Sequence, residues 1–179
     1  MRLFIGIFLP KEVLDYLYEA QNRLKKNLPA KITWVHKKIL HLSLKFIGEV
    51  NENKINEIKE RLNEIKFKSF KVKLDKIGVF PNENYIRVIW ISLNPKEKVI
   101  ELQQKVDSEL LDLFPKDQRF SAHMTFGRVK FIKDKEDFKK NLKIDIEEKE
   151  FEVNEFCLVK SELNKDGPKY EILERFKLN

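Results

Sequence analysis

One short pattern occurs twice in this chain, and its repetition constrains the fold more than any other feature. His41-Leu42-Ser43-Leu44 and His123-Met124-Thr125-Phe126 both read histidine, apolar residue, hydroxyl, apolar residue. This alternation is typical of a half-buried strand, on which the histidine and the hydroxyl share one face and the apolar side chains enter the core. We therefore expect two equivalent strands, each presenting an imidazole and a hydroxyl on the same face.

The sequence around the two copies repeats as well. Each motif is followed by a helix-like stretch, then by Phe70-Lys71-Val72 in the first half and Phe151-Glu152-Val153 in the second, and then by two strands joined by a turn. These turns are expected at Pro81-Asn82 and at Asp166-Gly167-Pro168. Two copies of one unit would pack about a pseudo-twofold axis, so the two histidines are expected to face each other across a shared cleft.

The order of elements predicts an α+β fold, because strand pairs joined by short turns favour antiparallel sheets. We expect two pseudo-symmetric lobes of antiparallel sheet with outer helices and a central cleft that carries both motifs. Residues 1–179 would form a single bilobal domain by internal duplication, with halves of about 1–93 and 94–179 and strands that could be exchanged between lobes. Asn94-Pro95 is expected to cap and open a helix that runs to about Phe114.

Composition narrows the class of partner and the compartment. The net charge of +7 and the pI of about 9.3 favour acidic partners, nucleic acid first. The alternative is that Lys and Glu simply alternate on solvated helix faces, which would account for most of the 36 basic residues. The single cysteine, Cys157, excludes an internal disulfide and is expected in the core. The apolar start of the chain is short and is expected to be a strand, and no segment reaches membrane-spanning length. We expect a soluble, cytoplasmic monomer.

The paired motifs suit acid-base chemistry on a phosphate ester. One neutral imidazole would take a proton from the attacking oxygen, while the other, protonated, gives one to the departing oxygen. Histidine suits both roles because its unperturbed side-chain pKa of about 6.5 lets either form exist near neutral pH. Ser43 and Thr125 would donate hydrogen bonds to the non-bridging oxygens. Two histidines and one core-like cysteine are too few ligands for an ordinary zinc site, so no metal or cofactor is expected.

Other polar residues near the motifs are less informative. His36 has no counterpart in the second half and is expected at the surface or rim of the site. Five basic residues could follow an RNA backbone: Lys37, Lys38, Lys45, Arg119 and Lys130.

Two stretches, His41 to Glu49 and His123 to Arg128, resemble the two motifs of the 2H phosphoesterase superfamily. Within that superfamily they are most similar to the RNA 2′,3′-cyclic phosphodiesterases, which were historically called 2′-5′ RNA ligases. The resemblance covers nearly the whole chain. It includes the opening Arg2-Leu3-Phe4-Ile5-Gly6-Ile7, Trp34-Val35 before the first motif, and at the end Leu158-Val159-Lys160-Ser161-Glu162-Leu163 with Gly167-Pro168-Lys169-Tyr170. Ser43 stands where the family more often has threonine, which keeps the hydroxyl.

The resemblance implies hydrolysis of a 2′,3′-cyclic phosphate at an RNA 3′ end, which leaves a 2′-phosphate. Fragments of tRNA would be among the substrates. The reverse reaction would join RNA ends through a 2′-5′ linkage. By matching order, His41 would be the proton donor and His123 the proton acceptor. The resemblance also places Phe46 and Arg128 beside the substrate. Strict alternation would turn both toward the core, so a bulge or strand end is needed, which Gly127 favours for Arg128; for Phe46 the core and base stacking are both open.

Two other functions fit the same residues. The first is a phosphodiesterase for 2′-5′-linked oligonucleotides or small cyclic phosphates, since the motifs define the chemistry and not the leaving group. The second is a non-catalytic RNA-binding module, whose affinity would fall steeply with salt and which would form no product.

Overall fold

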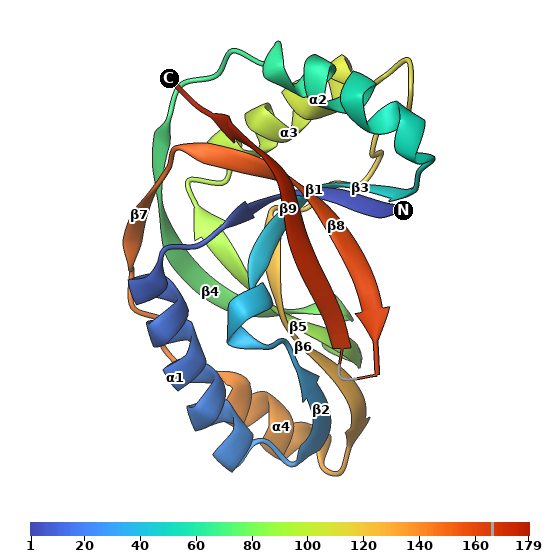
Figure 1. The fold of residues 1–179 in the computed structure, drawn as a ribbon. Coiled ribbons are helices and arrows are strands. Elements are labelled where there is room, and N and C mark those ends of the chain that lie inside the picture. Colours follow the sequence, from blue (N-terminus) through green and yellow to red (C-terminus); the bar gives the residue numbers. More distant parts are fainter. Residues whose placement is uncertain (166) are drawn as a thin grey trace.

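In the computed structural model, which describes residues 1–165 and 167–179, the strands form two antiparallel sheets (Figure 1). One sheet has the order β3-β1-β8-β9 and the other the order β2-β6-β5-β4-β7. The strands are β1 (Arg2–Phe8), β2 (Ala30–Trp34), β3 (His41–Glu49), β4 (Phe70–Asn82), β5 (Tyr85–Asn94), β6 (His123–Ile132), β7 (Glu150–Val153), β8 (Glu155–Asn164) and β9 (Gly167–Lys177). The predicted α+β class with antiparallel sheets is confirmed.

Each sheet is accompanied by a different pair of helices. The helices are α1 (Lys11–Asn27), α2 (Ile55–Asn63), α3 (Glu97–Glu109) and α4 (Lys135–Leu142). Figure 1 shows α2 and α3 together beside the first sheet, where α3 contacts β3 and α2 contacts β9. The helix α1 contacts α4, and its Gln21 donates a hydrogen bond of 3.0 Å to the Phe126 carbonyl in the second sheet. The arrangement is two-lobed, as the sequence predicted.

Each sheet combines strands from early and late parts of the chain. The first sheet joins β3 and β1 to β8 and β9, and the second joins β2, β5 and β4 to β6 and β7. In both, the strand that carries a motif has one neighbour that is central in the sheet: β1 beside β3, and β5 beside β6. The duplication itself, and its boundary, remain a prediction.

The apolar positions of both motifs lie where the alternation places them. Leu42, Leu44, Met124 and Phe126 are each at most 1% exposed. Cys157 is buried among apolar residues of β1 and β8, as predicted, and burial raises the pKa of its thiol to about 11. The motifs are therefore held from behind by the cores of their sheets. None of the helices in the described ranges is long and apolar enough to cross a membrane.

Two predicted boundaries are displaced. Asn94-Pro95 does not open α3: Asn94 still pairs with Lys73 at the end of β5, so its backbone belongs to the sheet, and the helix starts at Glu97. Pro81-Asn82 likewise belongs to the end of β4. Asn82 Oδ1 accepts 3.0 Å hydrogen bonds from the backbone N–H groups of Asn84 and Tyr85. Of the turn expected at Asp166-Gly167-Pro168, Asp166 lies outside the described residues, and Gly167 has a φ of +115°, which favours glycine.

Candidate active site

Both histidines begin their strands and present the same ring nitrogen to the backbone. His41 Nδ1 lies 2.7 Å from the Ile39 carbonyl oxygen, and His123 Nδ1 lies 2.8 Å from the Ser121 carbonyl oxygen. Because a carbonyl oxygen only accepts, each neutral ring carries its proton on Nδ1. The Nε2 atom of each neutral ring then carries no proton and is the nitrogen available for proton transfer.

His41 sits in an aromatic enclosure. Its ring centroid lies 4.8 Å from that of Phe4, 5.2 Å from that of Tyr170 and 5.8 Å from that of Phe8. Its Nε2 lies 2.9 Å from Ser43 Oγ, so the hydroxyl two residues away on the same strand face fixes the ring from the second side. Burial lowers the pKa of His41 below its usual value, which favours the neutral ring at pH 7 in the unliganded protein.

His123 is enclosed by aromatic rings from one side, and its pKa is influenced by the charge of Arg128. The Phe80 ring meets it edge-on at 4.9 Å, and the Trp90 ring lies 6.5 Å away. Trp90 lies against the backbone of Gly78, where a Cβ would come within 2.1 Å of the indole, so glycine is required there. Burial, and after it the charge of Arg128, lower the pKa of His123.

A β-bulge in each motif strand decides where Phe46 and Arg128 point. On β3, Ser43 pairs with Gly6 and Lys45 with Ile5, so Leu44 is skipped. On β6, Phe126 is skipped in the same way between Thr125 and Gly127. Two consecutive residues therefore turn inward after each motif, and the residue five positions after each histidine turns outward.

The bulges resolve the question that the sequence left open for Phe46. Its side chain is 67% exposed, so the core alternative is wrong. Arg128 is also exposed, and its charge acts on both His123 and Tyr170, which belong to different sheets. The charge of Arg128 therefore influences one residue of each sheet.

A pocket of about 310 Å³ joins residues from both motifs. It is lined by Ser43, Leu44, Lys45 and Phe46 of β3, by residues 117–121 of the loop before β6, and by His123. His41 adjoins it through its hydrogen bond to Ser43. Thr125 lies on the same strand face as His123 and pairs with Trp90 of the neighbouring strand β5. A larger hollow of about 430 Å³ around Arg2, Glu49 and Lys160 contains neither motif.

The structure adds a buried ion pair that the sequence did not reveal. Lys45, expected to be able to follow an RNA backbone, is 2% exposed; its Nζ donates to Asp107 Oδ1 at 2.5 Å and to the Pro115 carbonyl at 2.7 Å. Asp107 Oδ2 accepts from Gln103 Nε2 at 2.7 Å and from the Asp117 backbone N–H at 3.0 Å. The pair therefore anchors the loop that forms one wall of the pocket. No local pattern relates Lys45 to a carboxylate on α3.

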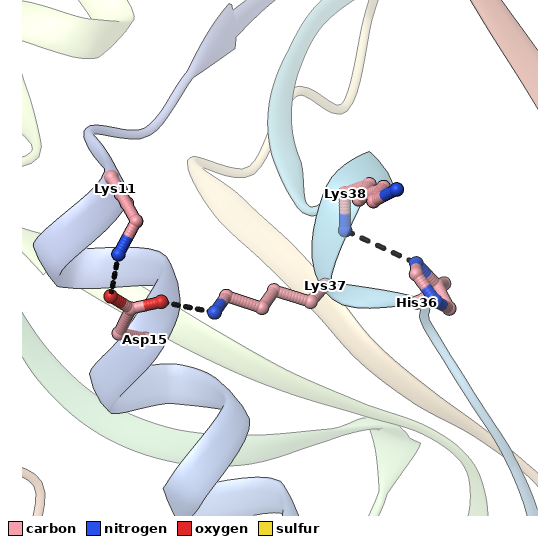
Figure 2. A network of polar contacts seen from close by, with 5 residues as sticks. All are labelled: Lys11, Asp15, His36, Lys37 and Lys38. Carbon is pink, nitrogen blue, oxygen red and sulfur yellow. Dashed lines mark hydrogen bonds and ion pairs between the residues drawn. The ribbon is translucent and has the colours of Figure 1, made fainter.

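The remaining basic residues near the first motif are held outside the pocket. Figure 2 shows Lys37 paired with Asp15 of α1, which also accepts a 2.7 Å hydrogen bond from Lys11. His36 is exposed, and its Nδ1 accepts from the Lys38 backbone N–H at 3.3 Å, so it caps the short 3-10 turn before the motif. Its placement at the surface agrees with the prediction.

Comparison with known proteins assigns the family. A model of the LigT like phosphoesterases matches residues 7–90 and 91–170, so it covers most of the chain in two segments. The chain belongs to this family. It is 38% identical over 180 residues to the RNA 2′,3′-cyclic phosphodiesterase of Methanocaldococcus jannaschii, with 98% of this chain and 100% of that protein aligned, and 35% identical over 187 residues to that of Archaeoglobus fulgidus, with 98% and 99% aligned.

Solved structures show the same fold. TT0787 of Thermus thermophilus matches with a TM-score of 0.81 at 27% identity, covering 99% of this chain and 98% of that one. E. coli LigT, in a complex with 3′-AMP, matches with a TM-score of 0.77 at 24% identity, covering 99% and 97%. The chain is therefore a phosphoesterase with the LigT fold, as its motifs indicated.

Proposed function

We propose that this protein hydrolyses 2′,3′-cyclic phosphates at RNA 3′ ends and leaves a 2′-phosphate. The observation that carries the proposal is the matched pair of histidines, each with Nδ1 fixed by a carbonyl and Nε2 left for proton transfer at one shared site. The names of the relatives, which align over nearly all of this chain, support the choice of substrate.

The reaction needs one base and one acid. His123 Nε2 takes a proton from water as the water oxygen bonds to phosphorus; the bond from phosphorus to the 3′ oxygen breaks, and His41 Nε2 gives its proton to that oxygen. The 2′ ester bond stays intact, so the phosphate remains on the 2′ oxygen. With a 5′-hydroxyl in place of water, the same ring opening forms a 2′-5′ linkage.

Arg128 supports this assignment of the two roles. A cation beside His123 opposes the imidazolium, so it favours the neutral form that a base requires. His41 has no such cation among the causes of its pKa shift, and the anionic phosphate would favour its protonated form.

Other residues would bind the substrate and stabilise charge. Ser43 and Thr125 would donate hydrogen bonds to the non-bridging oxygens, and Arg128 would offset the charge that develops on them. Phe46, exposed at the pocket, would stack on the terminal base. Each step uses protein groups alone, so the proposal requires no metal.

The test is an incubation of the purified protein, with excess EDTA, with an RNA that ends in a 2′,3′-cyclic phosphate, followed by determination of the phosphate position. A 2′-phosphate is expected. A 3′-phosphate would contradict the assigned direction of cleavage, and loss of turnover in EDTA would contradict the metal-free path.

A substrate panel separates this function from the alternatives. Turnover of 2′-5′-linked oligonucleotides or small cyclic phosphates, with none of RNA ends, would favour the phosphodiesterase for those substrates. Salt-sensitive RNA binding without any product would favour a binding module.

A further inference from the structure

Three neighbouring strands of the second sheet carry no carboxylate. The strands β2, β6 and β5 are adjacent in the sheet, as Figure 1 shows, and contain neither Asp nor Glu, although the chain has 29 such residues in 179. The same strands contain four cations: Lys31, Arg87, Arg128 and Lys130. The nearest carboxylates along the chain, Glu83 and Asp134, stand beyond the strand ends.

The register places the exposed residues of these strands on the face that carries the histidine. Arg128 pairs with Thr33 of β2 and Val88 of β5, and these residues share the face of Thr125 and His123 across the bulge. The alternate pair, Ile32 and Val129, faces the core. One strand face therefore continues from the active site along β6.

Two exposed aromatic side chains stand on this face, each beside a cation. Phe131 is 61% exposed and pairs directly with Lys31 of β2. Along β2, Lys31 stands two residues before Thr33, which pairs with Arg128. Tyr85 is 58% exposed at the start of β5, and the Arg87 guanidinium lies 5.5 Å from its ring centroid. Exposed aromatics that share one strand face with cations mark a candidate interaction surface.

We propose that this face, defined by Lys31, Tyr85, Arg87, Arg128 and Phe131, binds the nucleotides on the 5′ side of the cyclic phosphate as single-stranded RNA. The inference rests on the proposed function, because the phosphate held between the histidines fixes one end of the RNA.

Charge and shape favour this partner. Cations without neighbouring carboxylates suit a polyanion, and flat rings beside those cations suit stacked bases. From His123 to Phe131 the strand spans on the order of 25 Å at about 3.3 Å per residue, which is room for several nucleotides. The protein would thus act on RNA ends in preference to free cyclic nucleotides.

The experiment compares kcat/KM for a 2′,3′-cyclic mononucleotide, trinucleotide and hexanucleotide. The wild-type protein is expected to gain with length. The double variant Tyr85→Ala/Phe131→Ala should lose about 5- to 100-fold on the hexanucleotide, mainly through KM, and little on the mononucleotide. The matched control is Tyr18→Ala, which removes an exposed aromatic of α1 that lies beside Lys25 and Lys37. It should leave kcat/KM unchanged for every substrate.

A parallel binding measurement keeps the inference separate from catalysis. Fluorescence anisotropy with a labelled hexanucleotide ending in a 2′-phosphate should show weaker binding by Tyr85→Ala/Phe131→Ala and by Lys31→Gln/Arg87→Gln, and a smaller salt dependence for the latter. Hydrolysis of the mononucleotide with no gain for longer RNA, or unchanged binding by both double variants, would overturn the inference and leave the proposed function standing. Absence of turnover on every substrate would overturn the proposed function, and the binding data would still decide the RNA-binding face.

Discussion

The two motif strands have the same backbone and different surroundings. In both, the histidine opens the strand, its Nδ1 meets the carbonyl two residues earlier, and a bulge turns the fifth residue after it outward. Yet His41 is enclosed by three aromatic rings and bonded to Ser43, whereas His123 is subject to the charge of Arg128. The shared backbone presents both imidazoles in the same way, and the different surroundings are the basis of the different roles that we propose for them.

The strands differ again at the residue after the bulge, which is Lys45 on β3 and Gly127 on β6. Lys45 uses that inward position for a buried ion pair that holds the pocket loop, whereas Gly127 lies against Ile32 and Trp34 with no room for a side chain. A buried charge that loses its partner is strongly destabilising.

The largest expected effect, on stability, comes from breaking the buried Lys45–Asp107 ion pair, which the second motif lacks. Lys45→Met leaves Asp107 buried without its cation, so the free energy of unfolding should fall by about 3–5 kcal/mol in urea denaturation. The double variant Lys45→Met/Asp107→Leu should recover most of that loss, yet keep a raised KM because the loop has lost both anchors. A wild-type KM in a stable double variant would show that the pair does not position the pocket wall.

The next largest effect concerns the hydroxyls. Ser43→Ala and Thr125→Val should each lower kcat, by on the order of 10²-fold, because each removes a hydroxyl that we propose as a donor to the phosphate. The loss should be greater for Ser43→Ala, since Ser43 also holds His41 Nε2 at 2.9 Å. Steady-state kinetics on a cyclic phosphate substrate would measure both, and an equal or greater loss for Thr125→Val would remove this difference between the motifs.

Arg128 tests the assignment of the base. Burial is the main cause of the lowered pKa of His123, and the charge of Arg128 lowers it further, so Arg128→Gln should raise that pKa. A base acts in its neutral form, so the acidic limb of the pH profile of kcat/KM should move to higher pH, with kcat/KM at neutral pH reduced about 10-fold or more. Arg128→Lys, which keeps the charge, is the control. An acidic limb that stays in place in Arg128→Gln would assign it to another group.

The smallest effect is expected at the residue that corresponds to Arg128 in the first motif. Phe46 is 67% exposed, so Phe46→Ala should leave thermal stability unchanged and raise KM about 5-fold through lost stacking. Leu111→Ala, at a position that is 50% exposed and away from the pocket, should change neither. A KM effect of the same size in both variants would argue against stacking by Phe46.

The sequence allowed the motif strands, their buried faces and the fold class to be predicted, because these follow from local alternation and from the order of elements. It raised a bulge only as a condition for Phe46 and Arg128 to face the substrate, and could not show that one occurs on each motif strand. On β3 the bulge places Leu44 and Lys45 inward in succession and turns Phe46 outward. The sequence also could not pair Lys45 with Asp107, since that contact joins residues on different elements. Long-range contacts and single-residue bulges leave little local signal.

The most direct test of the two-histidine account is the kcat/KM of His41→Ala and His123→Ala on an RNA 2′,3′-cyclic phosphate, with His36→Ala as the exposed control. The account predicts a loss of about 10²–10⁴-fold for each of the first two variants, with circular dichroism and melting temperature preserved, and wild-type activity for the third. Activity within about 10-fold of wild type in either His41→Ala or His123→Ala would contradict it.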